Sequence, residues 1–386
     1  MSFAGGRGRP LLIPASALRV AVVAGTLGQG GAERQLFYLT TTLRRIGVDV
    51  LVLSLTRGEY WEERLHEAGV AVEWVGQRAA RAARLLAVTQ AARRHRADLI
   101  QSFHFFANPY AALAARALGR PDLGAIRSSG QGDLDSVGPA MSRLCVRLPR
   151  LLVANSEAAL TSLQHRGIPR HRLRMLPNVI DLDAFTPSAG RRERKPFTVV
   201  AIGRLSAQKR FDRALRVFAR FQAAATTDVR LVIAGAGSEA PALATLTREL
   251  GLGQRVTFTG PLADVRPLLA EADCLLLTSD YEGTPNVILE AMASARPVVA
   301  TAVGGVTALV EAEQTGLLAE PDDEASLSAA LTRLVKDPRL CARLGRQARL
   351  RVERRHSLGL MEDRILAIYR DVLPAPFLDR GGGGRP

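Results

Sequence analysis

The sequence predicts an α/β fold of two doubly wound, Rossmann-like domains that face each other across a cleft, and three observations lead to it. Short runs of Val, Ile, Leu and Ala alternate with helical patterns along the whole chain, as in folds built on a parallel sheet. The runs lack a strict polar alternation, which is typical of strands buried on both faces. A polar, charged stretch, residues 187–196, separates two such series, and 386 residues suit two domains of ordinary size.

The strands are expected in chain order on either side of this linker. The first series comprises residues 19–24, 48–55, 98–103, 124–128, 151–155 and 173–176. The second series comprises residues 197–203, 229–235, 255–259, 274–279 and 297–301. We therefore place an N-terminal domain at 18–186 and a C-terminal domain at 197–373, with flexible tails at 1–17 and 374–386.

Composition restricts the classes of function. No stretch reaches the roughly 18 apolar residues that a membrane-spanning helix requires, and Pro14 and Arg19 interrupt the first apolar run, so we expect a cytoplasmic protein. Three distant cysteines form neither a disulfide framework nor a metal cluster. Aromatic residues make up 5% of the chain and no nucleic-acid-binding motif is present, so no nucleic-acid partner is expected.

The net charge of +15 is concentrated in the first half, because residues 1–190 carry a net charge of +10. One basic helical region is expected to contain Arg78, Arg81, Arg84, Arg93, Arg94 and Arg96. A solvated helix face is one interpretation. The other is attraction to a phosphorylated acceptor or to an anionic membrane surface, which would make the protein peripheral at the inner face of the cell membrane.

A predicted helix N-terminus in the second domain has the features of an anion site. The segment EGTPNVILEAMA follows the strand at 274–279, and Thr284 and Pro285 are predicted to be the cap and the first residue of a helix that ends near Ser294. Such an N-terminus attracts an anion, and Gly283 lets the backbone approach a ligand closely.

Glu282 and Glu290 flank this anion site. Glu282 precedes the helix, where it can reach a sugar attached to the bound anion. Glu290 lies about one and a half turns inside the helix. A carboxylate can accept hydrogen bonds from both hydroxyls of a ribose diol. An exposed helix position is the alternative for Glu290, but its mostly apolar neighbours predict burial and therefore a partner.

Two cations follow the first strand of the second domain. Gly203 ends that strand, and Arg204 and Lys209 come within the turn after it. Fixed cations here stabilise a leaving diphosphate more strongly in the transition state than in the ground state. The alternative is that Arg204 and Lys209 are ordinary surface cations. This alternative is weakened because only three of the 52 basic residues are lysines. Since no Walker loop or Ser/His/Asp arrangement is present, we expect these cations and the helix dipole to serve without a cofactor or an obligatory metal.

Several residues at strand ends of the first domain are expected to face the sugar of the ligand or the second substrate that accepts it. Gly30 and Gly31 lead into a helix, and His104, Arg127 and Asn155 each follow a strand. For His104, packing among neighbouring phenylalanines is the alternative. The glycine loop lacks the third glycine and the later acid of a dinucleotide fingerprint, which argues against a nicotinamide enzyme.

Together these segments resemble the retaining glycosyltransferases of family 4, which have the GT-B fold. The matching pieces occur in family order and are GGAER at 30–34, VANSEA at 153–158, LPNVID at 176–181, GRLSAQKRFD at 203–212, IAGAGSE at 233–239, FTGPLADV at 258–265 and EGTPNVILEAMASARPVVATAVGG at 282–305. Two positions depart from the usual pattern, since Val179 and Ala295 stand where the family frequently has glycine.

The resemblance implies a role for each matching position. Arg204 and Lys209 would grip the donor diphosphate, and Glu290 would hold the ribose hydroxyls. Glu282 and the backbone of residues 283–286 would contact the sugar and the phosphates. A protein nucleophile is not expected, so Glu282 is not assigned that role.

The resemblance also extends to the first domain. It implies that His104 lies near the transferred sugar, and that Gly30 and Gly31 lie near the diphosphate or the acceptor. Members generally work without an obligatory metal. The last helix, near residues 354–373, is expected to cross back onto the first domain.

The expected function is hexosyl transfer with retention of configuration, from a UDP- or GDP-sugar to a saccharide or lipid-linked acceptor, in cell-envelope polysaccharide or glycolipid assembly. A GT-B nucleotide-sugar 2-epimerase is an alternative, because it would use the same donor site without an acceptor. A non-catalytic two-domain sugar-binding protein is the alternative from another class.

Overall fold

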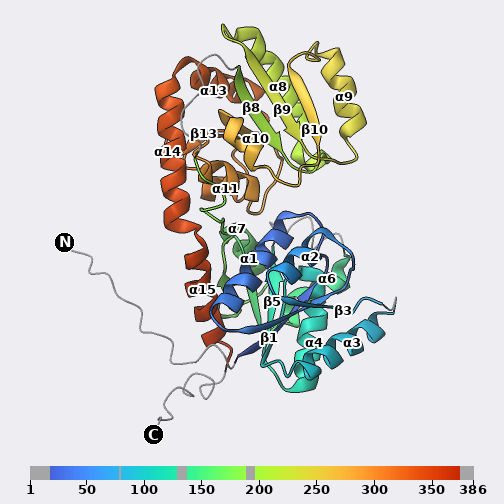
Figure 1. The fold of residues 1–386 in the computed structure, drawn as a ribbon. Coiled ribbons are helices and arrows are strands. Elements are labelled where there is room, and N and C mark those ends of the chain that lie inside the picture. The colour runs from blue at the N-terminus through green and yellow to red at the C-terminus, as the bar shows by residue number, and fades with distance from the viewer. Residues whose placement is uncertain (1–17, 78–79, 128–136, 188–195, 374–386) are drawn as a thin grey trace, which may run out of the picture.

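The computed structural model describes residues 18–77, 80–127, 137–187 and 196–373. Their strands form two separate sheets, one in each half of the chain, and all strand pairs are parallel (Figure 1). This confirms the predicted α/β class with two Rossmann-like domains. The two predicted tails and most of the predicted linker lie outside the described residues.

The first sheet has the strand order β3-β2-β1-β4-β5-β6-β7. Its strands are β1 (Arg19–Ala24), β2 (Asp49–Ser54), β3 (Ala71–Trp74), β4 (Leu99–Ser102), β5 (Asp122–Ile126), β6 (Leu151–Ala154) and β7 (Leu173–Met175). The helices between them are α1 (Gly31–Arg45), α2 (Tyr60–Glu67), α3 (Arg81–Arg94), α4 (Asn108–Leu118), α6 (Pro139–Arg147) and α7 (Glu157–His165).

The second sheet has the strand order β10-β9-β8-β11-β12-β13. Its strands are β8 (Phe197–Ile202), β9 (Val229–Ala234), β10 (Val256–Gly260), β11 (Cys274–Leu277), β12 (Val298–Thr301) and β13 (Gly316–Ala319). The helices that follow β8 are α8 (Phe211–Ala224), α9 (Ala240–Glu249), α10 (Arg266–Glu271), α11 (Asn286–Ala293), α12 (Val306–Leu309), α13 (Glu324–Lys336), α14 (Pro338–Arg355) and α15 (Leu358–Arg370).

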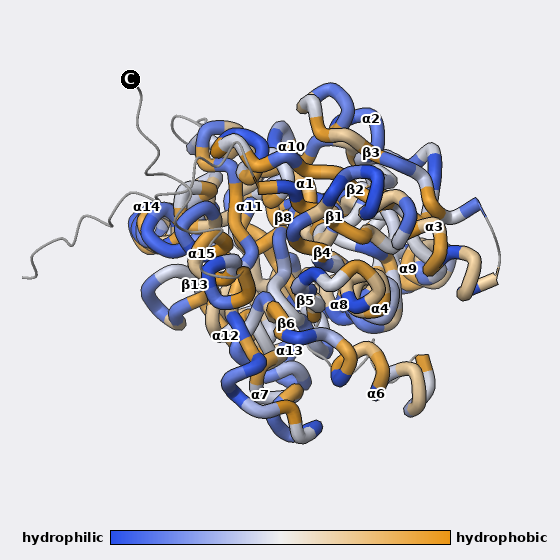
Figure 2. The backbone as a smooth tube through the Cα atoms, turned by 90° about the horizontal axis from the view of Figure 1, so that it is seen from below, coloured by the Kyte–Doolittle hydropathy of each residue, from blue (hydrophilic) through white to orange (hydrophobic). Residues whose placement is uncertain are grey.

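Both faces of each sheet are buried, which explains the unbroken apolar runs. In β1, Val20 and Val22 belong to the core that contains α1, whereas Ala21 and Val23 belong to the core that contains α3 and α4. The helices outside the sheets alternate between hydrophilic and hydrophobic residues along their turns (Figure 2). In each sheet the strand order reverses beside its first strand, β1 or β8, and ligands of doubly wound folds bind at the carboxyl ends of the strands there.

Two strands and one helix end differ from prediction. The four-residue strands β3 and β13 are absent from the predicted series. The helix α3 ends at Arg94, and Arg96 has a left-handed backbone (φ 55°), so Arg96 lies beyond the predicted basic helix. Arg78 lies outside the described residues. None of the described helices combines the length and the apolar character needed to cross a bilayer.

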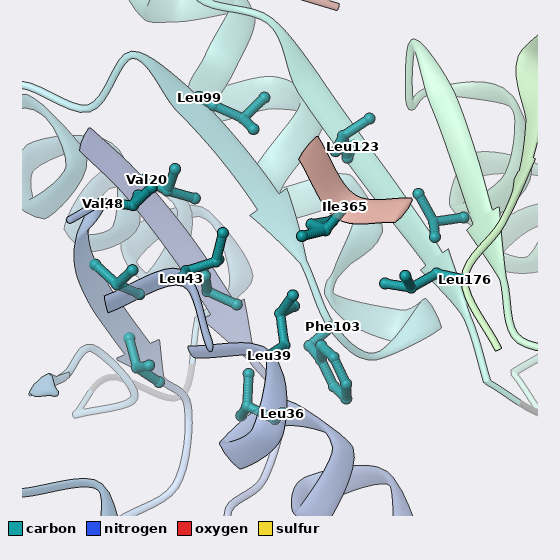
Figure 3. Packing of buried hydrophobic residues seen from close by; sticks show 14 of the residues in the cluster. Val20, Leu36, Leu39, Leu43, Val48, Leu99, Phe103, Leu123, Leu176 and Ile365 are labelled. Carbon is teal, nitrogen blue, oxygen red and sulfur yellow. The ribbon is translucent and has the colours of Figure 1, made fainter. Parts of the chain in front are cut away.

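The last helix packs in the first domain. Met361, Ile365 and Tyr369 of α15 are buried in the core cluster of the first sheet, and Figure 3 shows Ile365 in the same cluster as Leu39. The Tyr369 hydroxyl donates to Gln101 Oε1 at 2.7 Å. The helix therefore ties the end of the chain to the domain in which the chain begins.

The two crossings between the domains lie side by side. Ile180 N donates to His356 O at 2.8 Å, and Ile180 forms a parallel bridge with Ser357. His356 Nδ1 lies 2.8 Å from Asn178 O, so this nitrogen carries the proton and donates. Burial lowers the pKa of His356 to about 4, because the charged imidazolium is disfavoured away from water.

Candidate functional site

A cavity of about 720 Å³ lies between the two domains at the carboxyl ends of their strands. Its walls come from the segments after β1, β2, β5, β6 and β7 in the first domain and after β8, β9, β10 and β11 in the second. The predicted site residues that line it are Gly30, Gly31, Arg127, Asn155, Gly203, Arg204, Lys209, Glu282, Gly283, Thr284, Pro285, Asn286 and Glu290. The predicted site residues thus converge on one space from five separate segments.

Lys209 and Glu282 form an ion pair in the wall of the cavity. The turn after β8 brings Lys209 Nζ to 2.5 Å from Glu282 Oε1, and the Ser279 hydroxyl donates to the same oxygen at 2.7 Å. The Glu282 side chain is 6% exposed and that of Lys209 is 20% exposed. A nearly buried carboxylate thus keeps both a cation and a hydroxyl donor, which a buried charge requires.

The loop that carries Glu282 is held by close backbone packing. A Cβ at Gly305 would lie 1.5 Å from Gly283 O, and a Cβ at Gly304 would lie 2.2 Å from Glu282 O. Gly305 N also donates to Glu282 O at 3.1 Å. Only glycines can lie this close to residues 282–283, so the final GG of the matching segment fixes the position of the carboxylate.

The start of α11 differs from prediction. The helix begins at Asn286, Pro285 is the residue before it with an extended backbone (ψ 112°), and Thr284 is not the cap. The Thr284 hydroxyl donates instead to Asn155 O across the cleft at 3.1 Å. A contact with the other domain has replaced the local capping bond.

Asn286 connects three parts of the chain. Its Oδ1 accepts from Gln35 Nε2 and from Asn178 Nδ2, both at 3.0 Å, and its Nδ2 donates to Gly31 O at 2.8 Å. Gln35 and Asn178 are buried. Neither was among the predicted site residues, although Asn178 lies in the matching segment LPNVID and Gln35 directly follows GGAER.

Glu290 is paired across the domain boundary. Its Oε1 accepts from Arg34 Nη1, which comes from α1 of the first domain. The Glu290 side chain is 5% exposed, as its apolar neighbours predict, and both residues line the cavity. Arg34 is not among the predicted site residues, although it is the last residue of the GGAER segment.

His104 does not line the cavity, in contrast to Arg127 and Asn155. Gly25 N donates to His104 Nδ1 at 3.1 Å, so the neutral ring carries its proton on Nε2. That nitrogen lies 3.4 Å from Glu33 Oε1, and the ring stacks on Phe106. The structure therefore places His104 behind the wall, in the packed environment that was the alternative.

No cluster of three or more His, Cys, Asp or Glu side chains in the described ranges is arranged to hold a metal ion. The charged side chains of the cavity are Arg34, Arg127, Arg204, Lys209, Glu282 and Glu290. The site therefore presents four cations and two carboxylates, a surplus of positive charge that suits a ligand with two negative charges.

Two facing doubly wound domains with such an intervening cavity define the GT-B class of glycosyltransferase folds. Residues 29–184 match the model described as Glycosyltransferase Family 4, and residues 185–351 match the one described as Glycosyl transferases group 1. The two matches together span residues 29–351, and the chain belongs to glycosyltransferase family 4.

Similar proteins agree with this assignment. The chain is 32% identical over 176 residues to the alpha-D-kanosaminyltransferase of Streptomyces kanamyceticus, a match that covers 45% of each chain, so it spans less than half the length of that relative. It is 26% identical to the lipopolysaccharide core biosynthesis glycosyltransferase LpsD of Rhizobium meliloti, covering 88% of this chain and 95% of that one. The crystal structure of Anabaena HepE with UDP matches 92% of this chain and 100% of its own with a TM-score of 0.80, and at 23% identity this shows the fold.

Proposed function

We propose that the protein is a retaining glycosyltransferase that moves a hexosyl group from a UDP- or GDP-sugar to a saccharide or lipid-linked acceptor. One observation carries the proposal: two cations of the β8 turn, the N-terminus of α11 and two flanking carboxylates line a single interdomain cavity. HepE, which shares the fold, was crystallised with UDP and with UDP-glucose. LpsD carries a name from lipopolysaccharide core biosynthesis, which supports a role in cell-envelope polysaccharide or glycolipid assembly.

The ion pairs of the cavity suggest how the donor is received. Lys209 neutralises Glu282 in the absence of ligand, and a diphosphate gives this cation a second anionic partner. With Arg204 and the free N–H groups at the start of α11, Lys209 stabilises the charge that grows on the leaving diphosphate. The charge is thus met by groups of the chain, and we propose that no metal is obligatory.

Glu290 is proposed to orient the nucleoside. Arg34 binds one of its oxygens, which leaves lone pairs on the carboxylate to accept hydrogen bonds from ribose hydroxyls. Because Arg34 belongs to the first domain, this carboxylate is correctly oriented when the two domains are together. Glu282, beside the 283–285 turn, faces the sugar end of the donor.

The test begins with ligand identity. Nucleoside diphosphates and their sugars are screened for thermal stabilisation, since a ligand at 100 times its Kd stabilises by about 2.7 kcal/mol. The best donor is then incubated with and without candidate acceptors, and the anomeric configuration of the product is read by NMR. A retained anomer in an acceptor-dependent product supports the proposal. A new sugar formed from the donor alone would identify an epimerase, and binding without turnover would identify a sugar-binding protein.

A second part of the proposal concerns an anionic membrane surface, where a lipid-linked acceptor would be found. Arg81 and Arg93 on α3 are exposed, and Leu86 between them is 55% exposed. A basic helix with an exposed apolar side chain suits an anionic lipid surface. Co-sedimentation with vesicles that contain anionic lipid should fall when Arg78, Arg81 and Arg84 are replaced by Gln. Unchanged binding would refute this part and leave the donor site unaffected.

A further inference from the structure

The first-domain wall of the cavity contains buried polar atoms without a partner. We call Trp61, Arg127 and Asn155 the acceptor wall, since all three line the cavity from the first domain. Their unpaired atoms are Trp61 Nε1, Arg127 Nε and Asn155 Oδ1, three of the five such side-chain atoms in the described ranges. Buried polar atoms of folded proteins are nearly always hydrogen-bonded. Three exceptions on one cavity wall therefore point to a bound ligand that completes them.

Arg127 is a partly buried cation whose Nε atom is buried, and it has no counter-ion among the described residues. It extends from the end of β5, and its guanidinium lies over the ring of Phe103, 4.3 Å from the centroid. Within the described ranges, its one side-chain hydrogen bond is to Leu176 O, at 3.4 Å, and no carboxylate there forms an ion pair with it. Burial lowers the pKa of Arg127 to about 10, so the group stays charged at neutral pH. Such a charge is costly unless an anion lies beside it.

The other cations of the cavity are engaged in the donor site. Arg34 pairs with Glu290 and Lys209 pairs with Glu282, and Arg204 is exposed at the same turn as Lys209. The donor diphosphate therefore has its own cations in the second domain. The remaining cation, Arg127, belongs to the first domain.

The acceptor wall lies next to the sugar end of the donor site. Asn155 Nδ2 donates to Arg127 O at 3.0 Å, and Asn155 O accepts from the Thr284 hydroxyl at 3.1 Å. Thr284 belongs to the turn that also carries Glu282 and Gly283. A group bound to Arg127 would thus belong to the acceptor or to the far side of the transferred sugar.

We propose that the acceptor wall is a subsite for an acidic group, a carboxylate or a phosphate, carried by the acceptor or by the transferred sugar. Arg127 Nε and Trp61 Nε1 donate to the anionic oxygens, and Asn155 Oδ1 accepts from a neighbouring hydroxyl. The inference rests on the proposed function, because it deepens the description of the same cavity. It restricts the substrates to pairs in which one partner has an acidic group near the transferred centre.

The first experiment measures anion binding to the full-length protein. Inorganic phosphate is titrated by calorimetry into protein saturated with UDP, with chloride at equal ionic strength as the reference. We expect saturable phosphate binding in the wild type, at least 10-fold weaker binding in Arg127→Gln, and partial recovery in Arg127→Lys. The control variant Arg94→Gln removes an exposed arginine that pairs with Glu73 outside the cavity, and it should bind phosphate like the wild type.

The second experiment identifies which substrate carries the acid. One arm compares UDP-glucuronate with UDP-glucose, which differ by a carboxylate at one carbon. The other compares glucose 6-phosphate with glucose in the presence of UDP. In one arm the acidic member should bind at least 10-fold more tightly, and Arg127→Gln should remove that ratio. Equal affinities in both arms, or a ratio that Arg127→Gln leaves unchanged, would overturn the proposal.

Further readouts separate this role from a structural one. If Arg127 serves a ligand, Arg127→Gln should melt at an equal or higher temperature without ligand, because it removes a partly buried charge that has no counter-ion among the described residues. A lower melting temperature with unchanged phosphate binding would indicate a structural residue. Asp133 and Asp135 belong to the segment 128–136, outside the described residues. Phosphate binding that appears only when both are replaced by Asn would show that an internal acid occupies Arg127, and the proposal would be wrong.

The outcomes also separate this inference from the proposed function. Failure of every nucleoside diphosphate to bind would refute the donor site itself. Nucleotide binding that depends on Lys209, without any preference for an acidic sugar or acceptor, would refute the acidic subsite alone.

Discussion

Replacing Lys209 by Ala should weaken the binding of the donor nucleotide by about 10- to 150-fold. The substitution removes a cation that lines the cavity beside Glu282. A hydrogen bond from a charged donor contributes about 1.5–3 kcal/mol, and every 1.4 kcal/mol changes an affinity tenfold. Calorimetric titration of the best nucleoside diphosphate into both proteins measures the ratio directly. An affinity within twofold of the wild type, in a variant shown to be folded, would refute the assignment of Lys209 to the diphosphate.

The same substitution has an effect on stability that must be separated from binding. Without Lys209, Glu282 keeps only the Ser279 hydroxyl among the partners described above and becomes a buried charge without a cation. We expect a loss of about 1–3 kcal/mol in the free energy of unfolding, since Lys209 is itself partly exposed. The double variant Lys209→Ala/Glu282→Gln removes the unpaired charge. Urea unfolding should show recovered stability in the double variant, while calorimetry still shows weak nucleotide binding.

Three further outcomes are expected. Ala295 has a left-handed backbone (φ 55°), so Ala295→Gly should raise the free energy of unfolding by about 1 kcal/mol. The control Ala219→Gly inside α8 should lower it by a similar amount. Urea titration measures both variants, and a lower free energy of unfolding in Ala295→Gly would contradict the prediction. The pKa of His356 is about 4 in the folded protein and about 6.5 in the unfolded chain. Its contribution to stability is therefore present above pH 6.5 and falls by about 3 kcal/mol as the pH drops to 4. His356→Gln should show a correspondingly shallower pH dependence of the free energy of unfolding, and parallel curves for the two proteins would exclude this effect of His356. Transfer activity should persist in EDTA, and a loss that Mg²⁺ or Mn²⁺ restores would contradict the proposed metal-independent donor site.

The fold could be predicted from the sequence because most of its strands are buried on both faces. Runs such as that of β1 need no partner information to be recognised. The strand β3 has four residues, none of them fully buried, and includes Glu73, so its pattern is weak. The strand β13 is equally short and begins with Gly316. Both are edge strands, where pairing with one neighbour is enough and composition carries little signal.

Site residues that follow strands could be predicted from the sequence, whereas contacts between the two domains could not. Glu282, Glu290 and Lys209 were found from their positions beside a turn or a helix start. Arg34 reaches Glu290 across 256 positions of sequence, and no local pattern encodes that contact. Thr284 was misread because its hydroxyl bonds to the other domain, which overrides capping preference.

His104 and Arg127 show the same limit for two residues that both follow strands. The structure turns His104 away, because Gly25 and Phe106 hold its ring, whereas Arg127 reaches the cavity. Which of two strand-end side chains faces a ligand depends on the packing around each, and that information is not local.

The return of α15 to the first sheet has a consequence for biosynthesis. During translation residues 18–186 leave the ribosome long before residues 358–370, yet Met361, Ile365 and Tyr369 fill part of the same core. The nascent first half therefore exposes an apolar surface until residues 358–370 have left the ribosome, and Gln101 lacks its hydroxyl partner for that time. A ribosome-stalled chain that ends before residue 358 should accordingly be more sensitive to protease in its first half than the released protein.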